Sequence, residues 1–140
     1  MTAIQKFESF YTDLASMKIE QLASVYSNDV VFIDPIAAHE GINAVEDYFS
    51  KLLHNAKYCT FNIHEIQETK TNNHVVTWQM VFTSSRMNKG KPIAVDGITM
   101  LKIADDRVVY HRDYYDLGQM VYENIPLIGR LIKKIKRALS

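Results

Sequence analysis

Residues 30–35 are Val-Val-Phe-Ile-Asp-Pro, and this stretch decides how the rest of the chain is organised. Its first four residues are β-branched or aromatic, which predicts a short strand. Pro35 has no backbone N–H to give to a sheet, so the strand ends at Asp34. Because side chains alternate along a strand, Phe32 and Asp34 share one face. The strand therefore carries a carboxylate at its end, on the same side as an aromatic ring.

Helices are predicted on both sides of this strand. Apolar residues recur at three- and four-residue spacing over about residues 2–16, and again over residues 19–26. A polar turn cluster at residues 27–29 separates these two helices from the strand. Downstream, a loop leads to a third helix, near whose start Asn43 and Glu46 have capping-box spacing.

From Tyr58 the hydrophobic period changes to two. Turn-like sequences divide this part of the chain into four long predicted strands, at residues 58–68, 74–86, 92–103 and 107–115. Successive strands joined by short turns indicate an antiparallel meander. The order of elements predicts an α+β fold in which three N-terminal helices pack in a strongly bent antiparallel sheet with an interior. We expect one domain over residues 1–124, followed by an amphipathic helix over residues 125–140.

The composition excludes several classes of function. The 140 residues include 16 basic and 16 acidic side chains, so no overall positive field attracts a nucleic acid. The single cysteine, Cys59, excludes an internal disulfide and a cysteine-based zinc site. Five scattered glycines form no phosphate-binding loop, and no His-Glu cluster has metal-ligand spacing. We therefore expect no nucleic-acid partner, no metal and no cofactor.

The chain also lacks the sequence signals of export. Residues 1–15 are polar every few positions, unlike a signal peptide, and no stretch approaches the roughly 20 apolar residues of a membrane span. We expect a cytoplasmic protein.

Four stretches together resemble one known family. They are residues 30–35, 41–45, 96–99 and 107–116, and they occur in the order and at the spacing found in the nuclear transport factor 2-like superfamily, in particular its SnoaL-like branch. The resemblance covers nearly the whole chain. It implies a cone-shaped α+β barrel with an apolar pocket, and a homodimer.

Within this superfamily, the ketosteroid isomerases have an Asp-Pro at the end of the first strand, where the aspartate is the general base. The resemblance puts Asp34 at that position. Those enzymes also use an oxyanion hole made of a tyrosine and a neutral aspartic acid. Here the tyrosine position falls on Phe10, with Tyr11 one step away, and the aspartate position falls near Asp96.

Limonene epoxide hydrolase offers a second comparison, because its last strand is closely similar to residues 112–116. The resemblance puts Asp113 at a catalytic carboxylate that works on water. The same enzyme needs an arginine and a second aspartate two residues apart, and these positions are Trp78 and Met80 here. Epoxide hydrolysis by that mechanism is therefore not expected.

Alternation on the last strand puts Val109, His111, Asp113 and Tyr115 on one face. His111 and Asp113 can form an acid/base pair, since histidine titrates near neutral pH; the alternative is a buried structural pair. Asp34 is either a base or a turn carboxylate that binds nearby backbone amides. The aromatic content exceeds what a small core needs, so we expect a lined pocket. Its predicted wall is Tyr11, Tyr26, Phe32, Tyr48, Phe49, Leu52, Trp78, Met80, Phe82, Ile98 and Tyr115.

Two functions remain open at this point. The first is binding of a small apolar organic molecule, with cofactor-free acid/base chemistry of an isomerase, cyclase or hydrolase by Asp34, Asp96, His111 and Asp113. The second is a non-catalytic ligand-binding or dimeric protein-interaction module. The two differ in whether the cavity holds a reactive carboxyl group.

The C-terminal helix has two interpretations as well. Its basic face suits anionic lipid, and its apolar stripe suits packing over the pocket or on a partner subunit. We favour packing over contact with a membrane surface, since an amphipathic stripe is typical of a packed helix.

Overall fold

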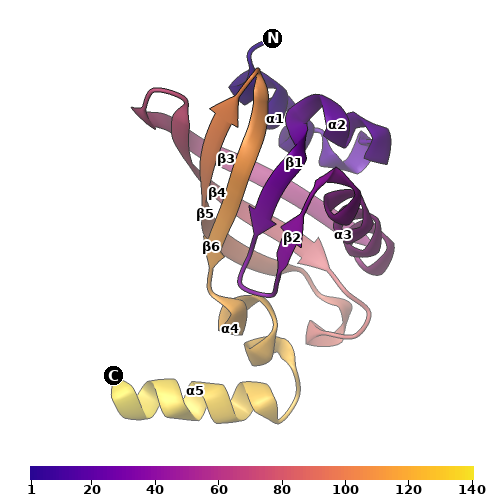
Figure 1. The fold of residues 1–140 in the computed structure, drawn as a ribbon. Helices are drawn as coiled ribbons and strands as arrows, with labels where there is room; N and C mark the ends of the chain where they lie inside the picture. Colours follow the sequence, from indigo (N-terminus) through magenta and orange to yellow (C-terminus); the bar gives the residue numbers. More distant parts are fainter.

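The computed structural model describes residues 1–140, and its centre is one curved six-stranded sheet (Figure 1). The spatial order is β2-β1-β6-β5-β4-β3. The last four strands form the antiparallel meander that the sequence predicts, and β1 joins it by pairing in parallel with β6. The strands are β1 (Tyr26–Ile33), β2 (Ala38–Glu40), β3 (Tyr58–Lys70), β4 (Asn73–Thr83), β5 (Ile93–Ala104) and β6 (Arg107–Tyr115).

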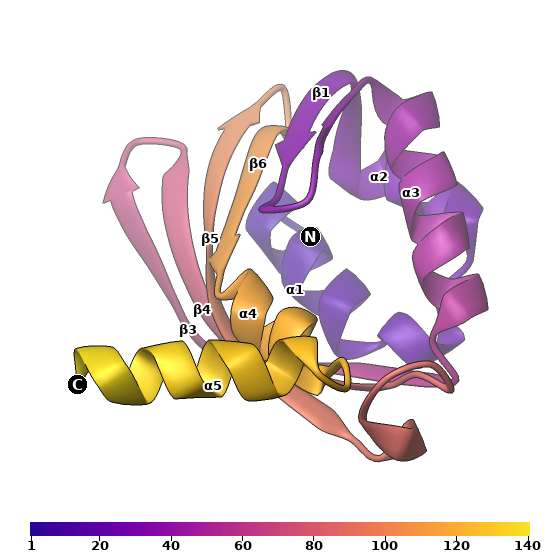
Figure 2. The same cartoon turned by 90° about the horizontal axis from the view of Figure 1, so that it is seen from below.

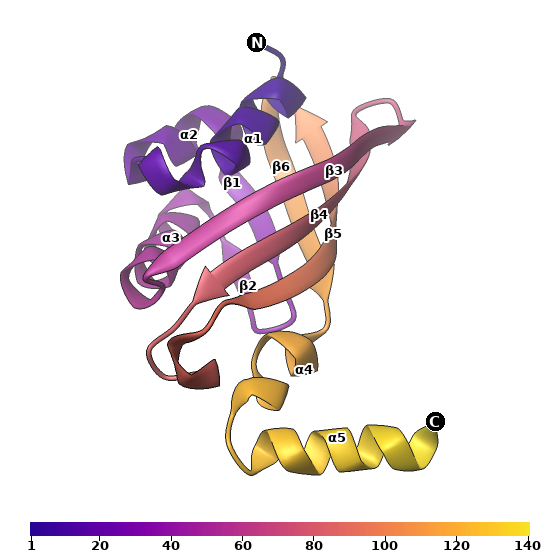
Figure 3. The same ribbon diagram turned by 180° about the vertical axis from the view of Figure 1, so that it is seen from behind.

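Helices cover the concave face of this sheet. Figures 2 and 3 show α1 running inside the curve of the sheet, with α3 on the opposite side next to β1. The α-helices are α1 (Ala3–Thr12), α2 (Leu22–Val25), α3 (Ile42–Asn55), α4 (Leu117–Met120) and α5 (Ile128–Leu139), and short 3-10 turns are η1 (Leu14–Ser16), η2 (Ile19–Gln21), η3 (Asn88–Gly90) and η4 (Tyr122–Asn124). None of them is long and apolar enough to cross a membrane. The predicted α+β class is confirmed.

The core fills the space between α1, α3 and the concave face. One buried cluster contains Phe7 and Phe10 of α1, Phe49 of α3 and alternate residues of β4, among them Val76 and Trp78. This alternation follows from the pleat of a strand, which turns every second side chain inward.

Several local predictions were wrong. The polar residues 27–29, expected as a turn, lie within β1, where the pairing with β6 is irregular between Tyr26 and Val31. Gly41, in place of Asn43, caps α3, since its φ of 85° is readily adopted only by glycine. On β6 a bulge leaves Val109 between two paired residues, so Val108 is buried on the side of His111.

Helix α5 does not pack over the pocket, which was one of the two arrangements that its apolar stripe suggested; packing on a partner subunit stays a prediction. Four apolar residues of α5 are exposed and Ile132 is half-buried, and the helix meets the rest of the chain at η4 (Figure 1). Gly129 is buried there and packs closely on η4: a Cβ atom at this position would lie 2.4 Å from the Glu123 carbonyl oxygen. The structure therefore presents the stripe to solvent rather than to the cavity.

Candidate functional site

A small apolar cavity lies between the helices and the inner face of the sheet. Its volume is about 40 Å³, room for one or two water molecules. Asp113 is the one charged group on its wall; the other lining residues are Tyr11, Phe32, Tyr48, Phe49, Leu52, Phe61, Trp78, Met80, Tyr115 and Met120. A still smaller void of about 10 Å³ lies beside it, shares Tyr11 and Asp113, and adds Thr99 and His111.

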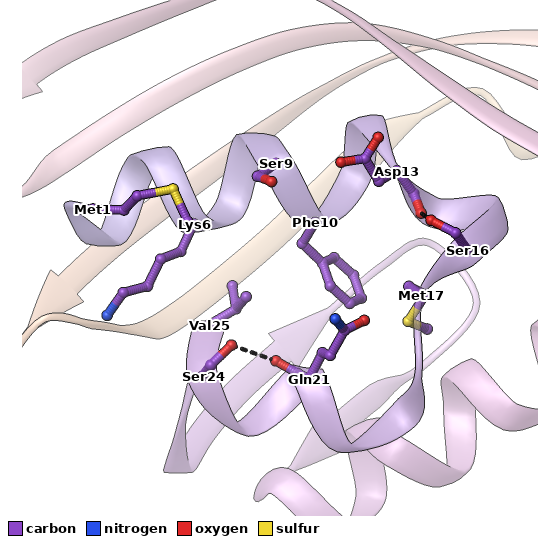
Figure 4. A pocket seen from close by; sticks show the side chains of 10 residues that line it. All are labelled: Met1, Lys6, Ser9, Phe10, Asp13, Ser16, Met17, Gln21, Ser24 and Val25. Atoms are coloured by element: carbon purple, nitrogen blue, oxygen red, sulfur yellow. Dashed lines mark hydrogen bonds between the residues drawn. The ribbon is translucent and has the colours of Figure 1, made fainter.

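Three wider grooves lie on the outside of the molecule. One, of about 240 Å³, runs between α1 and η2, and Figure 4 shows its mostly polar lining, with the Ser24 hydroxyl donating to the Gln21 carbonyl. The other two, of about 440 and 250 Å³, lie near Asn72 and between Pro92 and Lys133. The least exposed acid and base of these two grooves, Glu123 and His74, already have charged partners, Lys136 at 3.3 Å and Glu68 at 3.6 Å, so the inner cavity is the better candidate for chemistry.

Asp113 is held in place by two donors on the same oxygen. The Thr99 hydroxyl donates to Asp113 Oδ1 at 2.6 Å, and His111 Nε2 lies 2.7 Å from that oxygen. Thr99 in turn accepts from Trp78 Nε1 at 2.8 Å. The Oδ2 atom receives no hydrogen bond from the protein. One carboxylate oxygen is thus fixed, and the other is available to a molecule in the cavity.

The hydrogen bonds continue from His111 to two buried tyrosines. His111 Nδ1 lies 2.9 Å from the Tyr26 hydroxyl, which lies 2.7 Å from the Tyr11 hydroxyl. A neutral His111 with its proton on Nε2 gives each group a partner: Tyr11 donates to Tyr26, Tyr26 donates to Nδ1, and Nε2 donates to Asp113. His111 is 1% exposed and stacks on Phe32 with ring centres 4.0 Å apart. The chain therefore connects the cavity carboxylate to Tyr11, a second group on the same wall.

The tyrosines of this network stay protonated. Burial raises the pKa of Tyr11 well above its usual value, and the nearby Tyr26 and Asp113 raise it further. Burial also raises the pKa of Tyr26 strongly, although the hydrogen bond with Tyr11 lowers it in part. Both hydroxyls act as hydrogen-bond partners and not as phenolates.

Asp34 has a different environment. Its Oδ1 accepts from the backbone N–H groups of Ile36 and Ala37 at 2.8 and 2.9 Å, and its Oδ2 accepts from the Tyr48 hydroxyl at 2.7 Å. Asp34 is buried but does not line the cavity, whereas Tyr48 does. Burial and the charge of Asp34 raise the pKa of Tyr48. This is the turn carboxylate that the sequence left as an alternative, and it positions Tyr48.

A family model described as a SnoaL-like domain matches residues 7–111. This chain belongs to the SnoaL-like domain family. The match spans three quarters of the chain and includes most of α1, all of α2 and α3, and most of the sheet. A search of curated proteins found no match to the SnoaL-like chain.

Solved structures similar to this SnoaL-like domain share its NTF2-like fold. A protein of Catenulispora acidiphila with a ketosteroid isomerase-like fold, in complex with trimethylamine, is 15% identical with a TM-score of 0.75, covering 89% of this chain and 93% of its own. A putative SnoaL-like polyketide cyclase of Shewanella putrefaciens is 20% identical with a TM-score of 0.70, covering 84% and 92%. An epoxide hydrolase of M. tuberculosis, similar to limonene epoxide hydrolase, is 15% identical with a TM-score of 0.70, covering 84% and 85%. At these identities the similarity establishes the fold alone.

The SnoaL-like domain brings together most of the residues that the sequence singled out. Asp113 and eight predicted wall residues line the cavity: Tyr11, Phe32, Tyr48, Phe49, Leu52, Trp78, Met80 and Tyr115. His111 and Tyr26 lie behind this wall in the hydrogen-bonded chain. Phe82 is buried in the core but does not line the cavity.

Two residues that we predicted in the site lie outside the cavity. Asp96 and Ile98 lie on the outer face of β5, where Asp96 accepts from the Gln79 side chain and Ile98 is 43% exposed. The reason is the alternation of β5, which turns Val95, Gly97 and Thr99 inward instead. Strand β5 therefore supplies no acid to the cavity, and Asp113 of β6 is the one acid on its wall.

Three residues of the site were not predicted from the sequence. Phe61 lies on the wall, and alternation from the buried Cys59 on β3 indicates its direction. Thr99 lies three residues after Asp96 and faces the opposite side of β5, and the resemblance assigned a role in this stretch to Asp96 alone. Met120 lies in α4, beyond the last strand, and no pattern in the sequence marks it as part of the cavity.

Proposed function

We propose that this SnoaL-like protein binds a small, mostly apolar organic molecule in the inner cavity and transfers a proton on it with its own side chains. The observation that carries the proposal is Asp113, a carboxylate on an otherwise uncharged wall, with one oxygen fixed and the other without a protein partner. Solved neighbours named as a putative polyketide cyclase and an epoxide hydrolase support an activity on organic molecules.

In this proposal Asp113 is the general base. Its Oδ2 takes a proton from the bound molecule, and the same carboxyl group returns the proton to another atom of that molecule. His111 and Thr99 hold Oδ1 by hydrogen bonds and so keep Oδ2 directed at the cavity. Proton transfer by a positioned group contributes about 10²- to 10⁴-fold to a rate.

Tyr115 is the best candidate to stabilise negative charge that develops on an oxygen of the bound molecule. It lines the cavity beside Asp113, and its hydroxyl makes no hydrogen bond within the protein. Burial, together with the charges of Asp34 and Asp113, raises the pKa of Tyr115. Its hydroxyl therefore stays protonated and can act as a hydrogen-bond donor to the bound molecule. Such preorganised donors act where charge develops in the transition state.

The size of the cavity limits what can enter. Pockets for drug-sized molecules are about 300–1,000 Å³, far above the volume of about 40 Å³ seen here. A ligand must therefore be small, or it must displace side chains of the wall. Met120 in the short helix α4 is the best candidate for displacement, because methionine is unbranched and adapts its shape easily, and Met120 is only half-buried whereas Met80 is buried.

The test combines ligand binding and turnover. A thermal-shift screen with steroids, terpenes, polyketide-like aromatics and fatty acids identifies binders, since a ligand at about 100 times its Kd adds about 2.7 kcal/mol of stability. Binders are then assayed for turnover by the unaltered protein and by two variants. We expect Asp113→Asn to keep binding but to lose at least about 100-fold in turnover, as removal of a general base does.

Asp96→Asn is the matched control, because it makes the same chemical change on the outer face of β5. It should change neither binding nor turnover. Turnover by Asp113→Asn equal to that of Asp96→Asn would refute Asp113 as the base.

A second candidate function rests on the outer face of the sheet. Ile98, Met100 and Tyr114 are exposed side by side on β5 and β6 and form an apolar patch. Such a patch is typical of an interface, and it supports the expected homodimer with a non-catalytic role. Light scattering on a sizing column measures the oligomeric state, and a dimer that Met100→Glu dissociates, without any ligand in the screen, would favour this function.

A further inference from the structure

Helix α5 has one apolar and one basic side, and both are open to solvent. Ile128, Leu131, Ile135 and Leu139 recur at three- and four-residue spacing and are between 46 and 83% exposed. Single exposed apolar residues are common, but four on one stripe of one helix form a surface that water solvates poorly.

The opposite side of α5 carries only positive charge. It holds Arg130, Lys133, Lys134, Lys136 and Arg137, and the helix contains no acidic residue. Since the whole chain has 16 basic and 16 acidic residues, the rest of the chain has 11 basic and 16 acidic ones, a net charge of −5. The helix is therefore positively charged, and the rest of the molecule is negatively charged.

The attachment of α5 holds it away from the body. Gly129 packs against the Glu123 carbonyl, and Lys136 forms an ion pair with the Glu123 side chain at 3.3 Å. From this joint the helix extends past the edge of the sheet, as Figures 1 and 3 show. Apart from the half-buried Ile132, its apolar stripe is left exposed by the rest of the chain.

We propose that α5 docks this protein on an anionic membrane surface. A helix with an apolar stripe on one side and a lysine-rich polar face on the other lies in the plane of the interface, with the stripe among the acyl chains and the cations at the headgroups. Long lysine side chains at the border between the two faces can place their ammonium groups among the phosphates while their methylenes stay apolar. At 12 residues, α5 is about 18 Å long, too short to span a bilayer but long enough to lie along it.

A second copy of the chain suits this helix less well. The apolar patch on the outer sheet face is the surface that a copy offers, and two cations border it: Lys102 lies over the Tyr110 ring and Arg112 over the Tyr114 ring. Like charges on both surfaces oppose the docking of α5 on this patch. An anionic lipid surface matches both faces of the helix.

Membrane docking would also determine where the cavity lies relative to the bilayer. Helix α4, which supplies Met120 to the cavity wall, is joined to α5 through η4, which contacts both helices. Resting on the proposed function, docking of α5 would bring this end of the cavity close to the bilayer, which assigns the ligand to molecules that dissolve in the membrane.

Flotation of the full chain with lipid vesicles tests the docking. Vesicles of phosphatidylcholine alone are compared with vesicles that also contain phosphatidylglycerol, at low and at high salt. We expect binding only to the anionic vesicles, and we expect salt to weaken it. Each basic residue near an anionic surface raises the partition constant between vesicle and solution about five-fold. Reversing both Lys133 and Lys134 to Glu should therefore reduce binding by more than about 100-fold.

The apolar stripe is tested by Leu131→Glu, and Tyr58→Glu is the matched control, since Tyr58 is a similarly exposed side chain on β3, outside α5 and outside the apolar patch. Leu131→Glu should lower binding at least about 10-fold, the effect of burying one leucine, while Tyr58→Glu should leave binding unchanged. Absence of binding to anionic vesicles would overturn the proposal, as would equal loss in both variants. So would a dimer that Leu131→Glu dissociates without any vesicle binding. Because vesicle binding is measured without a ligand, its failure is distinct from a failure of Asp113→Asn to lose turnover.

Discussion

Replacing Thr99 by valine tests whether the hydrogen bonds behind Asp113 stabilise the fold. Valine has nearly the same shape, so the change removes the hydroxyl and little else. Thr99 is buried, accepts from Trp78 Nε1 at 2.8 Å and donates to Asp113 Oδ1 at 2.6 Å. The variant loses a hydrogen bond to a charged group and leaves the indole N–H without a partner, and each loss costs roughly 1–3 kcal/mol. We expect the free energy of unfolding to fall by about 3 kcal/mol.

Urea unfolding followed by tryptophan fluorescence measures this change, because Trp78 is the only tryptophan. Thr99→Ser is the control: it keeps the hydroxyl and loses one methyl group, a cost of about 1 kcal/mol. The reasoning is refuted if Thr99→Val is no less stable than Thr99→Ser. That result would mean that the indole and the carboxylate find other partners at no cost.

Two further predictions concern stability and packing. Burial raises the pKa of the Cys59 thiol from 9.0 to about 11, so the neutral thiol is favoured in the folded state. The contribution of this thiol to folding stability is complete below pH 9 and is lost as the pH rises to about 11. Urea midpoints between pH 8 and 11 should therefore fall less in Cys59→Ala than in the unaltered protein, and an equal fall in both would contradict the assigned cause. Gly97→Ala should destabilise the protein by about 1–3 kcal/mol, because the new Cβ would lie 2.3 Å from ring carbons of Trp78. The emission of Trp78 should shift as well, and an unchanged spectrum with unchanged stability would show that the indole moves aside freely.

Much of the fold is predictable from periodicity because burial imposes it. The period of two from Tyr58 onward marks all four meander strands, and helical spacing marks α1 and α3. The same reasoning places His111 and Asp113 on one side of β6, since they are two residues apart. It fails at Val109, because a bulge adds a residue and reverses the alternation.

The network around His111 depends on contacts that sequence patterns do not contain. Tyr26 and His111 are 85 residues apart, and they meet only because β1 pairs in parallel with β6, where Phe32 lies opposite His111. Asp96 was assigned from family resemblance, whereas the alternation of β5 alone would have placed it outside. Local periodicity thus gives the direction of a side chain, and long-range strand pairing decides which groups it meets.

The chain of hydrogen bonds from Asp113 to Tyr11 has a consequence for ligand choice, because such a chain runs in one of two directions. With His111 neutral, the Tyr11 proton points away from the cavity toward Tyr26. With His111 doubly protonated, Nδ1 donates to Tyr26, Tyr26 donates to Tyr11, and the Tyr11 proton turns to the cavity. A ligand that accepts a hydrogen bond from Tyr11 favours the direction in which Tyr26 donates to Tyr11, and a ligand that donates to Tyr11 favours the reverse. The hydrogen-bonding character of the ligand would thus be coupled to a histidine that the ligand does not touch.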